Sequence, residues 1–492
     1  MAVIDAPSTE QEDDQRGGFG ALGVSVGLLV VAWSAGIASF PIKDNSFFTH
    51  LATGRIILDT GRVPSSDPYT FTAGGVDWVV QSWLASVAYA AAERAGGVIG
   101  LRLLVLALFV VAGALLWRLS RPATSIVMRL LVVAGALFVV TSAWSERPYM
   151  IGFIGLGVVW LALEGAVRPL LLVPLLWVWA NAHGSFPLAG LLVLTVLAGE
   201  ALDRRRARRA DPGADRAAGS LATEVAVLKA VVLGTLLAVI GPLGIDVLLF
   251  PLNAVTRSDV LSNIVEWQSP EFTSVPDRMF LLLAMLAFAG LVRAGRWRLA
   301  LPTLIFTASG IVAQRNVVMA VAVLVPVLAA CAPAVGSLTA RSRPALGRAF
   351  AAVCAVVAAA VGALALTGPL GTLEPYPWRA VAWLGPLDEV GPVATQDFTG
   401  NLLEVLDGPE GQVFIDDRAD MFPRDVFADI TTLVRGEPAW REVLDTYEIE
   451  VVVWKRSAPL SSLLAADAEW QLVFADTEWS VACRRDGGCA LE

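Results

Sequence analysis

Four long stretches without Asp, Glu, Lys or Arg constrain this chain more than any other feature. They run from Gly18 to Ile42, Pro169 to Gly199, Asn316 to Ala340 and Ala349 to Leu373. Each is long enough for the roughly 20 residues with which a helix crosses a bilayer. Of the 492 residues, 56% are hydrophobic and only 16% are charged, whereas soluble domains are about 25% charged. The sequence therefore predicts an α-helical polytopic membrane protein and excludes a soluble enzyme.

The basic residues predict how the helices are arranged across the membrane, because Lys and Arg concentrate in cytoplasmic loops. Residues 1–371 hold 27 basic residues, and 18 of them fall on one side if the chain crosses eleven times from a cytoplasmic N-terminus. The N-terminal segment is acidic and lacks the pattern of a signal peptide, so we expect the first apolar stretch to remain as a helix. An odd number of crossings then places the C-terminus outside. The other ten expected spans lie near residues 98–117, 126–142, 149–165, 169–182, 186–202, 224–243, 278–293, 299–313, 317–334 and 349–369.

Residues 81–97 are apolar enough for a further crossing. A crossing there would reverse every later loop and place the RRRARR run at 204–209 outside, against the charge rule. We therefore expect residues 81–97 to form an interfacial helix. We interpret the RRRARR run as a topology determinant with some attraction to anionic lipid.

The C-terminal part of the chain differs from the rest in charge. From Thr372 onward the formal charge is −14, whereas residues 1–371 carry +5. We expect a cytoplasmic tail at residues 1–18, a transmembrane domain at 19–370 with its first extracytoplasmic loop at 43–97, and an extracytoplasmic domain at 371–492. Neither charged part is typical of a nucleic-acid-binding protein.

The acidic C-terminal part alternates short apolar strands with amphipathic helices. The expected strands are VATQDF, QVFID, IEVVVW, WQLVFAD and WSVAC, and the expected helices are TGNLLEVL, RDVFADITTLV, PAWREVLDTY and APLSSLLA. This alternation favours a small α/β domain. The segment DDRADMFPRD at 416–425 follows an expected strand, which is where α/β proteins place their sites. We nevertheless interpret this segment as a solvated turn held by Arg–Asp pairs, with a site as the alternative.

Polar residues that the topology does not require gather in the outer loops. Asp44 follows the first expected helix, where its carboxylate serves either as a general base or as the cap of a helix that begins near Ser46. Asp67 precedes Pro68, which favours a turn residue over a catalytic one. His50 also belongs to this first outer loop.

Two outer arginines suggest contact with an anion. Arg147 lies in SERPY, and Arg315 lies in QRN between two apolar runs. Ionisable groups at such depth are costly, so they usually serve a substrate or pair with one another. Arginine suits phosphate because its planar fork donates two parallel hydrogen bonds. The alternative is a structural ion pair with Glu146 or Glu266.

Two further outer residues have both a functional and a structural interpretation. His183 lies in NAHGSF between two apolar halves of a charge-free stretch, and it either contacts substrate or is structural. Glu266, next to Trp267, is either a second acid near the site or a surface group.

The sequence lacks a P-loop, a GxGxxG fingerprint, an HExxH motif and paired CxxC motifs. Nucleotide hydrolysis, dinucleotide redox chemistry and zinc protease chemistry therefore have no support. Cys331 and Cys354 lie in expected spans and are interpreted as inert, whereas Cys483 and Cys489 lie outside, where they can close a small loop. No cofactor is required by any motif, and a divalent metal ion stays an open alternative.

The outer segments resemble the GT-C superfamily of integral-membrane glycosyltransferases, which use polyprenyl-phosphate-linked sugars. The resemblance rests on KDNSFFTHLATGRIILDTGRVPSSDPYT, ERPY, NAHGSF and QRN, and it covers roughly residues 20–370. The DDRADMFP tail looks like the extracytoplasmic domain of many uncharacterised bacterial members. The resemblance implies Asp44 as catalytic base. Many members carry two adjacent acids there, but Asn45 follows Asp44 in this chain, which leaves Asp67 or Glu266 as second acid.

From these features we expect an inverting glycosyltransferase of the cell membrane that moves a sugar from a polyprenyl-phosphate donor to a glycan, lipid or protein acceptor of the cell envelope. Asp44 would take the acceptor proton, and Arg147, Arg315 and His183 would stabilise the lipid phosphate, with His50 a further substrate contact. Membrane lipids are expected partners and nucleic acid is not. The alternatives are a transporter or flippase of lipid-linked intermediates, which predicts polar residues at mid-membrane, and a noncatalytic envelope scaffold.

Overall fold

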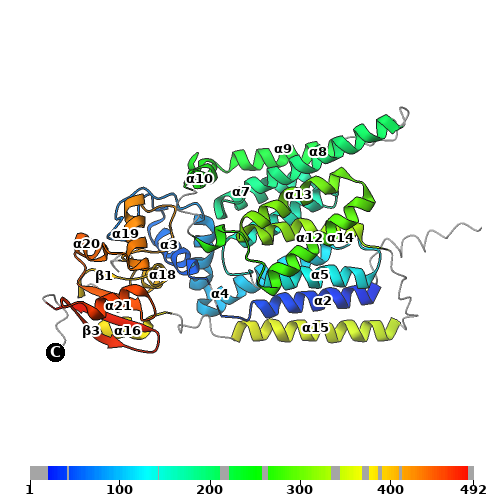
Figure 1. The fold of residues 1–492 in the computed structure, drawn as a ribbon. Coiled ribbons are helices and arrows are strands. Elements are labelled where there is room, and N and C mark those ends of the chain that lie inside the picture. Colours follow the sequence, from blue (N-terminus) through cyan, green and yellow to red (C-terminus); the bar gives the residue numbers. More distant parts are fainter. Residues whose placement is uncertain are drawn as a thin grey trace, which may run out of the picture. The chain divides into compact units, whose positions relative to one another are not determined.

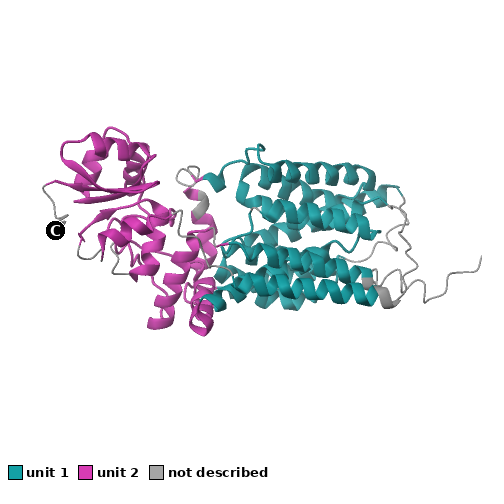
Figure 2. Cartoon of the chain, turned by 90° about the horizontal axis from the view of Figure 1, so that it is seen from below, with its two compact units in different colours: residues 1–40, 98–238, 265–368 teal, residues 41–97, 239–264, 369–492 magenta. Residues whose placement is uncertain are grey.

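The computed structural model describes residues 20–41, 44–141, 143–210, 221–257, 264–333, 344–367, 376–385, 390–408 and 413–485. The expected tail at 1–18 and Cys489 lie outside these ranges. The chain divides into two compact units, which Figure 2 colours separately. Unit 1 comprises residues 1–40, 98–238 and 265–368, and unit 2 comprises residues 41–97, 239–264 and 369–492.

Unit 1 is a bundle of α-helices (Figure 1). Each of the eleven expected ranges contains a helix in the described part of the chain. The helices are α2 (Gly20–Ile37), the second part of α4 (Trp83–Leu119), α5 (Ile126–Thr141), α6 (Tyr149–Leu163), α7 (Leu172–Ala182), α8 (Pro187–Ala210), α9 (Ala222–Leu237), α12 (Val275–Ala294), α13 (Trp297–Val312), α14 (Val317–Cys331) and α15 (Pro344–Thr367). Short 3₁₀ turns, η1 (Pro169–Leu171), η3 (Val265–Trp267) and η4 (Gln314–Asn316), lie between them.

Four helices in the described residues are long and apolar enough to cross a membrane: Trp83–Leu119, Val275–Ala294, Gln314–Cys331 and Gly347–Thr367. Shorter apolar helices accompany them. Much of their apolar surface is exposed, as for Val356 and Leu364 of α15, which are 68% and 65% exposed. Water disfavours so large an apolar surface, whereas lipid does not. The helices therefore suggest a multi-pass helical membrane protein, and the number of eleven crossings stays a prediction.

Helix α14 forms the centre of unit 1. It packs against α5, α6, α12 and α13, and its residues from Val317 to Ala329 are all buried. A helix that is apolar on every side is stable only when neighbours cover every side. At the edge of the bundle α15 packs along α2, and the two run side by side in Figure 1.

Residues 83–96 are helical, as expected for the segment 81–97. The helix is interrupted at Gly97, which has φ 56° and ψ −140°. Only glycine adopts such a backbone conformation without strain. The boundary between the two units falls at the same residue. The interfacial position of this helix stays a prediction.

Unit 2 contains a four-stranded sheet with strand order β1-β2-β4-β3. Strands β1 (Val393–Ala394) and β2 (Val451–Lys455) pair in parallel, whereas β4 (Trp479–Arg484) is antiparallel to both β2 and β3 (Trp470–Ala475). The helices of the described part of this unit are α3 (Ser46–Thr60), the first part of α4, α10 (Asp246–Thr256), α16 (Trp378–Leu384), α18 (Asp397–Leu406), α19 (Arg424–Arg435), α20 (Trp440–Thr446) and α21 (Pro459–Ala466).

Two of the expected strands are largely wrong. VATQDF forms a strand only at Val393 and Ala394, since helix α18 already begins at Asp397. Within QVFID, the described residues contribute only an isolated parallel bridge from Val413 to Thr70. The other strands and all four helices of the acidic part lie at the expected positions to within a few residues.

Residues 41–97, which contain the expected first extracytoplasmic loop at 43–97, belong to unit 2 together with residues 369–492, and the expected domain boundaries stay a prediction. This loop packs with the C-terminal part of the chain. Tyr69 and Trp78 of the loop share one buried apolar cluster with Phe414, Phe422 and Trp454. The physical reason is that the loop carries aromatic residues that no local partner can bury.

Residues 239–264 also belong to unit 2. The guanidinium group of Arg257 donates to the backbone carbonyl oxygens of Asp420 and Phe422. Three separate segments of the chain therefore meet around residues 414–422.

Candidate functional site

Asp44 lies at the start of helix α3. Its Oδ1 accepts hydrogen bonds from the backbone nitrogen of Ser46 at 3.1 Å and from the Ser46 hydroxyl at 2.8 Å. These bonds satisfy donors at the helix N-terminus that have no partner within the helix. The capping role that the sequence allows for Asp44 is therefore present, and the role of general base stays a prediction.

The next residue, Asn45, connects the first loop to the C-terminal part. Its amide nitrogen donates to Oδ1 of Asn401 at 2.9 Å and lies 3.5 Å from Oδ2 of Asp417. Asn401 in turn donates to Oδ1 of Asp417 at 2.7 Å and to the hydroxyl of Thr49. Asp417 from the C-terminal part thus lies near Asp44 and Asn45, whereas the sequence offered Asp67 or Glu266 as second acid.

Asp417 has unusual electrostatics for a partly exposed carboxyl group. Burial raises the pKa of Asp417 to about 7, and the neighbouring Asp416 and Asp44 add to the increase. Hydrogen bonds from Ser46 and Asn401 oppose it. A carboxyl group with a pKa near neutrality can both accept and donate a proton at physiological pH.

Arg418 links Asp67 to the tail. Its guanidinium group lies 2.6 Å from a carboxylate oxygen of Asp67 and 2.6 Å from one of Asp416, and it stacks over Trp78 with 4.3 Å between Cζ and the ring centroid. Glu404 is fully buried 4.0 Å away. Burial, followed by the charge of Asp416, raises the pKa of Glu404 well above its usual range.

The structure corrects our interpretation of DDRADMFPRD as a solvated turn. The Arg–Asp pairing is present, but Asp416 is 1% exposed and Arg418 is 7% exposed. Residues 416–422 of the segment are largely buried because the first loop packs next to them, through the parallel bridge from Thr70 to Val413 and the bond from the Thr72 hydroxyl to the Phe414 carbonyl.

Asp67 is a turn residue, as its sequence context predicts. Its two carboxylate oxygens accept from the backbone nitrogens of Tyr69 and Thr70, each at 3.1 Å, and from the Thr70 hydroxyl at 2.5 Å. With the ion pair to Arg418 added, Asp67 is a buried structural anion. These contacts argue against a second acid at this position.

His50 lies on α3 and faces the first part of α4. Its Nδ1 is 3.1 Å from the Ser86 hydroxyl, and its ring centroid is 6.2 Å from that of Tyr89. Asp44, His50 and Asp67 therefore all lie in unit 2, but only Asp44 lies in the network around Asp417.

The remaining candidates lie in unit 1. Arg147 forms an ion pair of 2.5 Å with Glu266, and Arg315 lies 4.0 Å from the same carboxylate. Arg315 also stacks over Trp267 with 4.3 Å between Cζ and the ring centroid. The ion pair with Glu266 that the sequence left open is therefore present. Formally these three charged groups sum to +1.

His183 ends helix α7 close to Tyr149, with ring centroids 6.5 Å apart. Its Nδ1 accepts from the backbone nitrogen of Ser185 at 3.2 Å and lies 2.8 Å from the Ser185 hydroxyl, which itself accepts from Trp179. This pattern assigns the proton of the neutral ring to Nε2, the nitrogen that can donate to a phosphate oxygen.

Sequence reasoning missed Asn401, Glu404 and Asp417 as partners of the first loop. The expected helix TGNLLEVL held a signal for these partners. Asn401 and Glu404 lie one helical turn apart on a face with apolar neighbours, and polar groups buried in this way need polar partners.

Among the described residues, no group of three or more His, Cys, Asp or Glu is arranged to hold a metal ion. Cys483 is disulfide-bonded, whereas Cys331 and Cys354 are free thiols. No family model and no curated protein matches this chain.

Proposed function

We propose that this chain is a membrane glycosyltransferase of the GT-C type, which transfers a sugar from a polyprenyl-phosphate donor to a hydroxyl or amine of a cell-envelope acceptor. The observation that carries the proposal is the network of Asn45, Asn401 and Asp417 next to Asp44, which joins the segment after the first helix to the C-terminal part of the chain. A carboxylate accepts a hydrogen bond from the hydroxyl group of the acceptor substrate. A side-chain amide can both donate a hydrogen bond to a sugar hydroxyl and accept one from it.

In the proposed reaction, the hydroxyl oxygen of the acceptor attacks the anomeric carbon of the sugar, and Asp44 removes the proton of that hydroxyl group. The bond from that carbon to the phosphate oxygen breaks, and the electron pair leaves with the polyprenyl phosphate. One displacement inverts the sugar carbon. The nearby Asp417 keeps the proton in the site, because its pKa of about 7 suits transfer to and from Asp44.

The donor phosphate is assigned to Arg147, Arg315 and His183 of unit 1. A phosphodiester carries one negative charge, which matches the formal +1 of the two arginines with Glu266. The leaving phosphate gains further negative charge, which the guanidinium groups and Nε2 of His183 stabilise. Stabilisation of such developing charge is commonly the largest catalytic contribution. The eleven crossings and the extracytoplasmic position of both groups belong to the same proposal.

The base assignment is tested by offering the purified protein radiolabelled polyprenyl-phosphate sugars and envelope acceptors. Asp44→Asn keeps an oxygen that caps helix α3, because Asn caps as well as Asp, but it removes the base. We expect the transfer rate to fall by about 10²–10⁴-fold. The control is Asp59→Asn on the same helix, at an exposed carboxylate paired with Arg94. Equal transfer by Asp44→Asn and the control would reject the role of base.

The phosphate assignment is tested by donor binding. Arg315→Ala is expected to weaken binding of the polyprenyl-phosphate donor by about tenfold or more, which is the contribution of one charge-assisted hydrogen bond. Arg278→Ala is the matched control, because Arg278, among the described residues, donates to the carbonyl oxygens of Phe272 and Thr273. Unchanged donor binding in Arg315→Ala would remove this residue from the proposal.

A further inference from the structure

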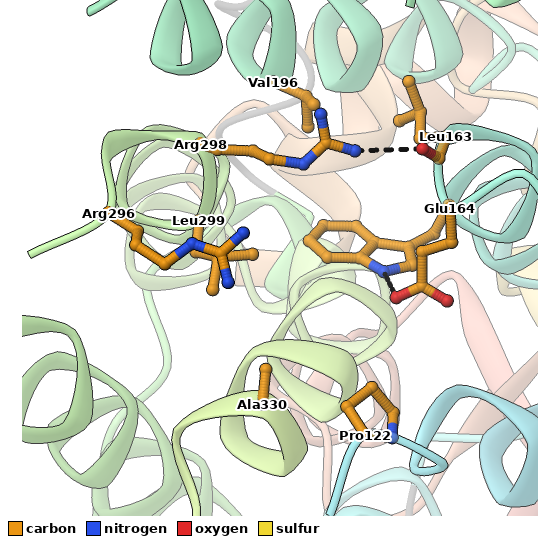
Figure 3. Close-up of a pocket in the computed structure, with 9 residues that line it drawn as sticks. Pro122, Leu163, Glu164, Val196, Arg296, Arg298, Leu299 and Ala330 are labelled. Atoms are coloured by element: carbon orange, nitrogen blue, oxygen red, sulfur yellow. Dashed lines mark hydrogen bonds between the residues drawn. The ribbon is translucent and has the colours of Figure 1, made fainter. Parts of the chain in front are cut away.

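A pocket of about 210 Å³ lies within unit 1 at the ends of several helices. Figure 3 shows its lining. Leu163 and Glu164 come from the end of α6, Arg296 and Arg298 from the start of α13, and Pro122 from the turn between α4 and α5. Trp160, Val196, Leu299 and Ala330 complete it.

This pocket is distinct from the proposed donor site. Helix α6 starts at Tyr149, two residues after Arg147, and ends next to the pocket at Leu163. Helix α13 starts at the pocket and ends at Val312, three residues before Arg315. At about 1.5 Å per residue, these helices separate the two places by about 22–24 Å. On the expected topology, the pocket lies at the cytoplasmic end of the bundle.

Most charges around the pocket are already paired. Arg298 forms an ion pair with Glu224, lies 3.6 Å from Glu200, and donates to the Leu163 carbonyl at 2.9 Å. Glu164 accepts from the Trp160 indole at 2.9 Å, and it interacts electrostatically with Arg118.

The start of α13 is also satisfied. The Asp203 carboxylate accepts from the backbone nitrogens of Trp297 and Arg298, at 2.8 and 2.9 Å. Helix α13 therefore offers no open backbone donors at these two positions, and attraction for a ligand has to come from side chains.

Arg296 is the second guanidinium group in the pocket lining. Over the described ranges, no carboxylate forms an ion pair with it, although its side chain is exposed and lines the pocket. Arg121, adjacent to Pro122 in the lining, adds positive charge that acts on Arg118 and Arg129. The pocket therefore combines apolar side chains and the Trp160 indole with the guanidinium groups of Arg296 and Arg298 and the carboxylate of Glu164.

We propose that this pocket binds a phosphate group, held by Arg296, at the end of unit 1 away from the proposed donor site. Arginine recognises phosphate through its planar fork of donors. The volume of about 210 Å³ is below the roughly 300–1,000 Å³ of sites for drug-sized ligands, which favours a headgroup or a free ion over a nucleotide. The phosphate belongs either to an anionic phospholipid or to free inorganic phosphate, and the test distinguishes these sources.

The experiment measures binding of phosphatidylglycerol to the full-length protein in detergent by native mass spectrometry. Three proteins are compared: wild type, Arg296→Gln, and Arg293→Gln. Arg293 is an exposed arginine in the last turn of α12 that does not line the pocket, so it controls for general surface charge. We expect wild type and Arg293→Gln to bind one lipid with similar affinity, and Arg296→Gln to bind about tenfold more weakly.

Inorganic phosphate then serves as competitor in a second arm. If it displaces the lipid from wild type, the pocket accepts the free ion, and if it does not, the pocket requires the lipid headgroup; either result supports phosphate recognition. Equal binding by Arg296→Gln and wild type would overturn the proposal. An equal loss in Arg293→Gln would also overturn it, because the attraction would then be a property of the whole basic surface. A thermal unfolding scan establishes that Arg296→Gln is folded.

Discussion

Arg418 is a buried arginine in unit 2 that is surrounded by several carboxylates. Its buried guanidinium group balances Asp67 and Asp416, stacks on Trp78 and Tyr69, and lies close to the buried Glu404. A buried ion pair adds little stability compared with an apolar replacement of both partners, but removal of one partner leaves an uncompensated charge.

We therefore expect Arg418→Ala to destabilise unit 2 by about 3–5 kcal/mol. Hydrogen–deuterium exchange of the β2 amides provides the measurement, since β2 is central in the sheet of this unit. Arg435→Ala is the control, because Arg435 is 61% exposed and pairs loosely with Glu437; surface pairs contribute about 0–1 kcal/mol. If both variants exchanged at the same rate, the ion-pair network would not stabilise the fold.

Asp417 provides a second prediction at this scale. An acid with a folded-state pKa of about 7 and an ordinary value of 3.8 is protonated in the folded protein while the unfolded chain is already ionised. Its contribution to stability is therefore fully present below about pH 4 and is lost as pH rises to about 7. The pKa values of Asp397, Asp420 and Glu404 are raised in the same direction by burial.

Asp417→Asn should accordingly reduce the loss of stability between pH 4 and pH 7, because the amide cannot ionise. The measurement is the thermal unfolding midpoint of unit 2 across this range. The exposed Asp425→Asn in the same segment should retain the slope of the wild type. A slope in Asp417→Asn as steep as in the wild type would show that Asp417 ionises normally in the folded protein.

Among the elements, helix α3 depends on a close approach to α4. A Cβ placed on Gly54 would lie 1.9 Å from the Ser86 carbonyl oxygen and 2.9 Å from the Ala90 Cβ. We expect Gly54→Ala to push α3 and α4 apart and to destabilise unit 2 by about 1–3 kcal/mol or more. Gly96→Ala, at the end of the same helical segment, meets no atom within 4 Å, and alanine favours helix, so it should be neutral or stabilising. Thermal unfolding of both variants tests the contact.

The elements also indicate what sequence patterns can and cannot predict. The helices at the eleven expected apolar stretches and the amphipathic helices α18 to α21 lie close to their expected positions, because each pattern is local, whereas α10 and α16 were not expected. VATQDF failed because Asp397 starts a helix after only two strand residues. QVFID failed because its described partner is Thr70, more than 300 residues away in the chain, and no local pattern contains that pairing.

For the whole molecule, charge separated the acidic C-terminal part from the bundle, but it did not assign the first loop to a unit. Tyr69, Trp78 and Asp67 join that loop to Phe414 and Arg418 through packing and ion pairs between distant segments. Such long-range contacts are invisible to hydropathy. The sequence therefore indicates candidate residues one at a time. Their neighbours Asn401, Glu404 and Asp417 could be identified only from the three-dimensional structure.

The arrangement across the membrane is testable by cysteine labelling in intact cells. The background protein has Cys331 and Cys354, the two free thiols, replaced by alanine. The eleven-crossing arrangement predicts that Asp59→Cys, at an exposed position of α3 in the first outer loop, reacts with a membrane-impermeant maleimide. Ala207→Cys, within the basic run at the end of α8, should react only after the membrane is opened. Lys and Arg resist translocation, so six residues with five arginines keep that helix end inside. Labelling of Ala207→Cys in intact cells would contradict the eleven-crossing arrangement. The pocket at Arg296 would then lie on the outer side, and the outer positions assigned to Arg147 and Arg315 would no longer hold.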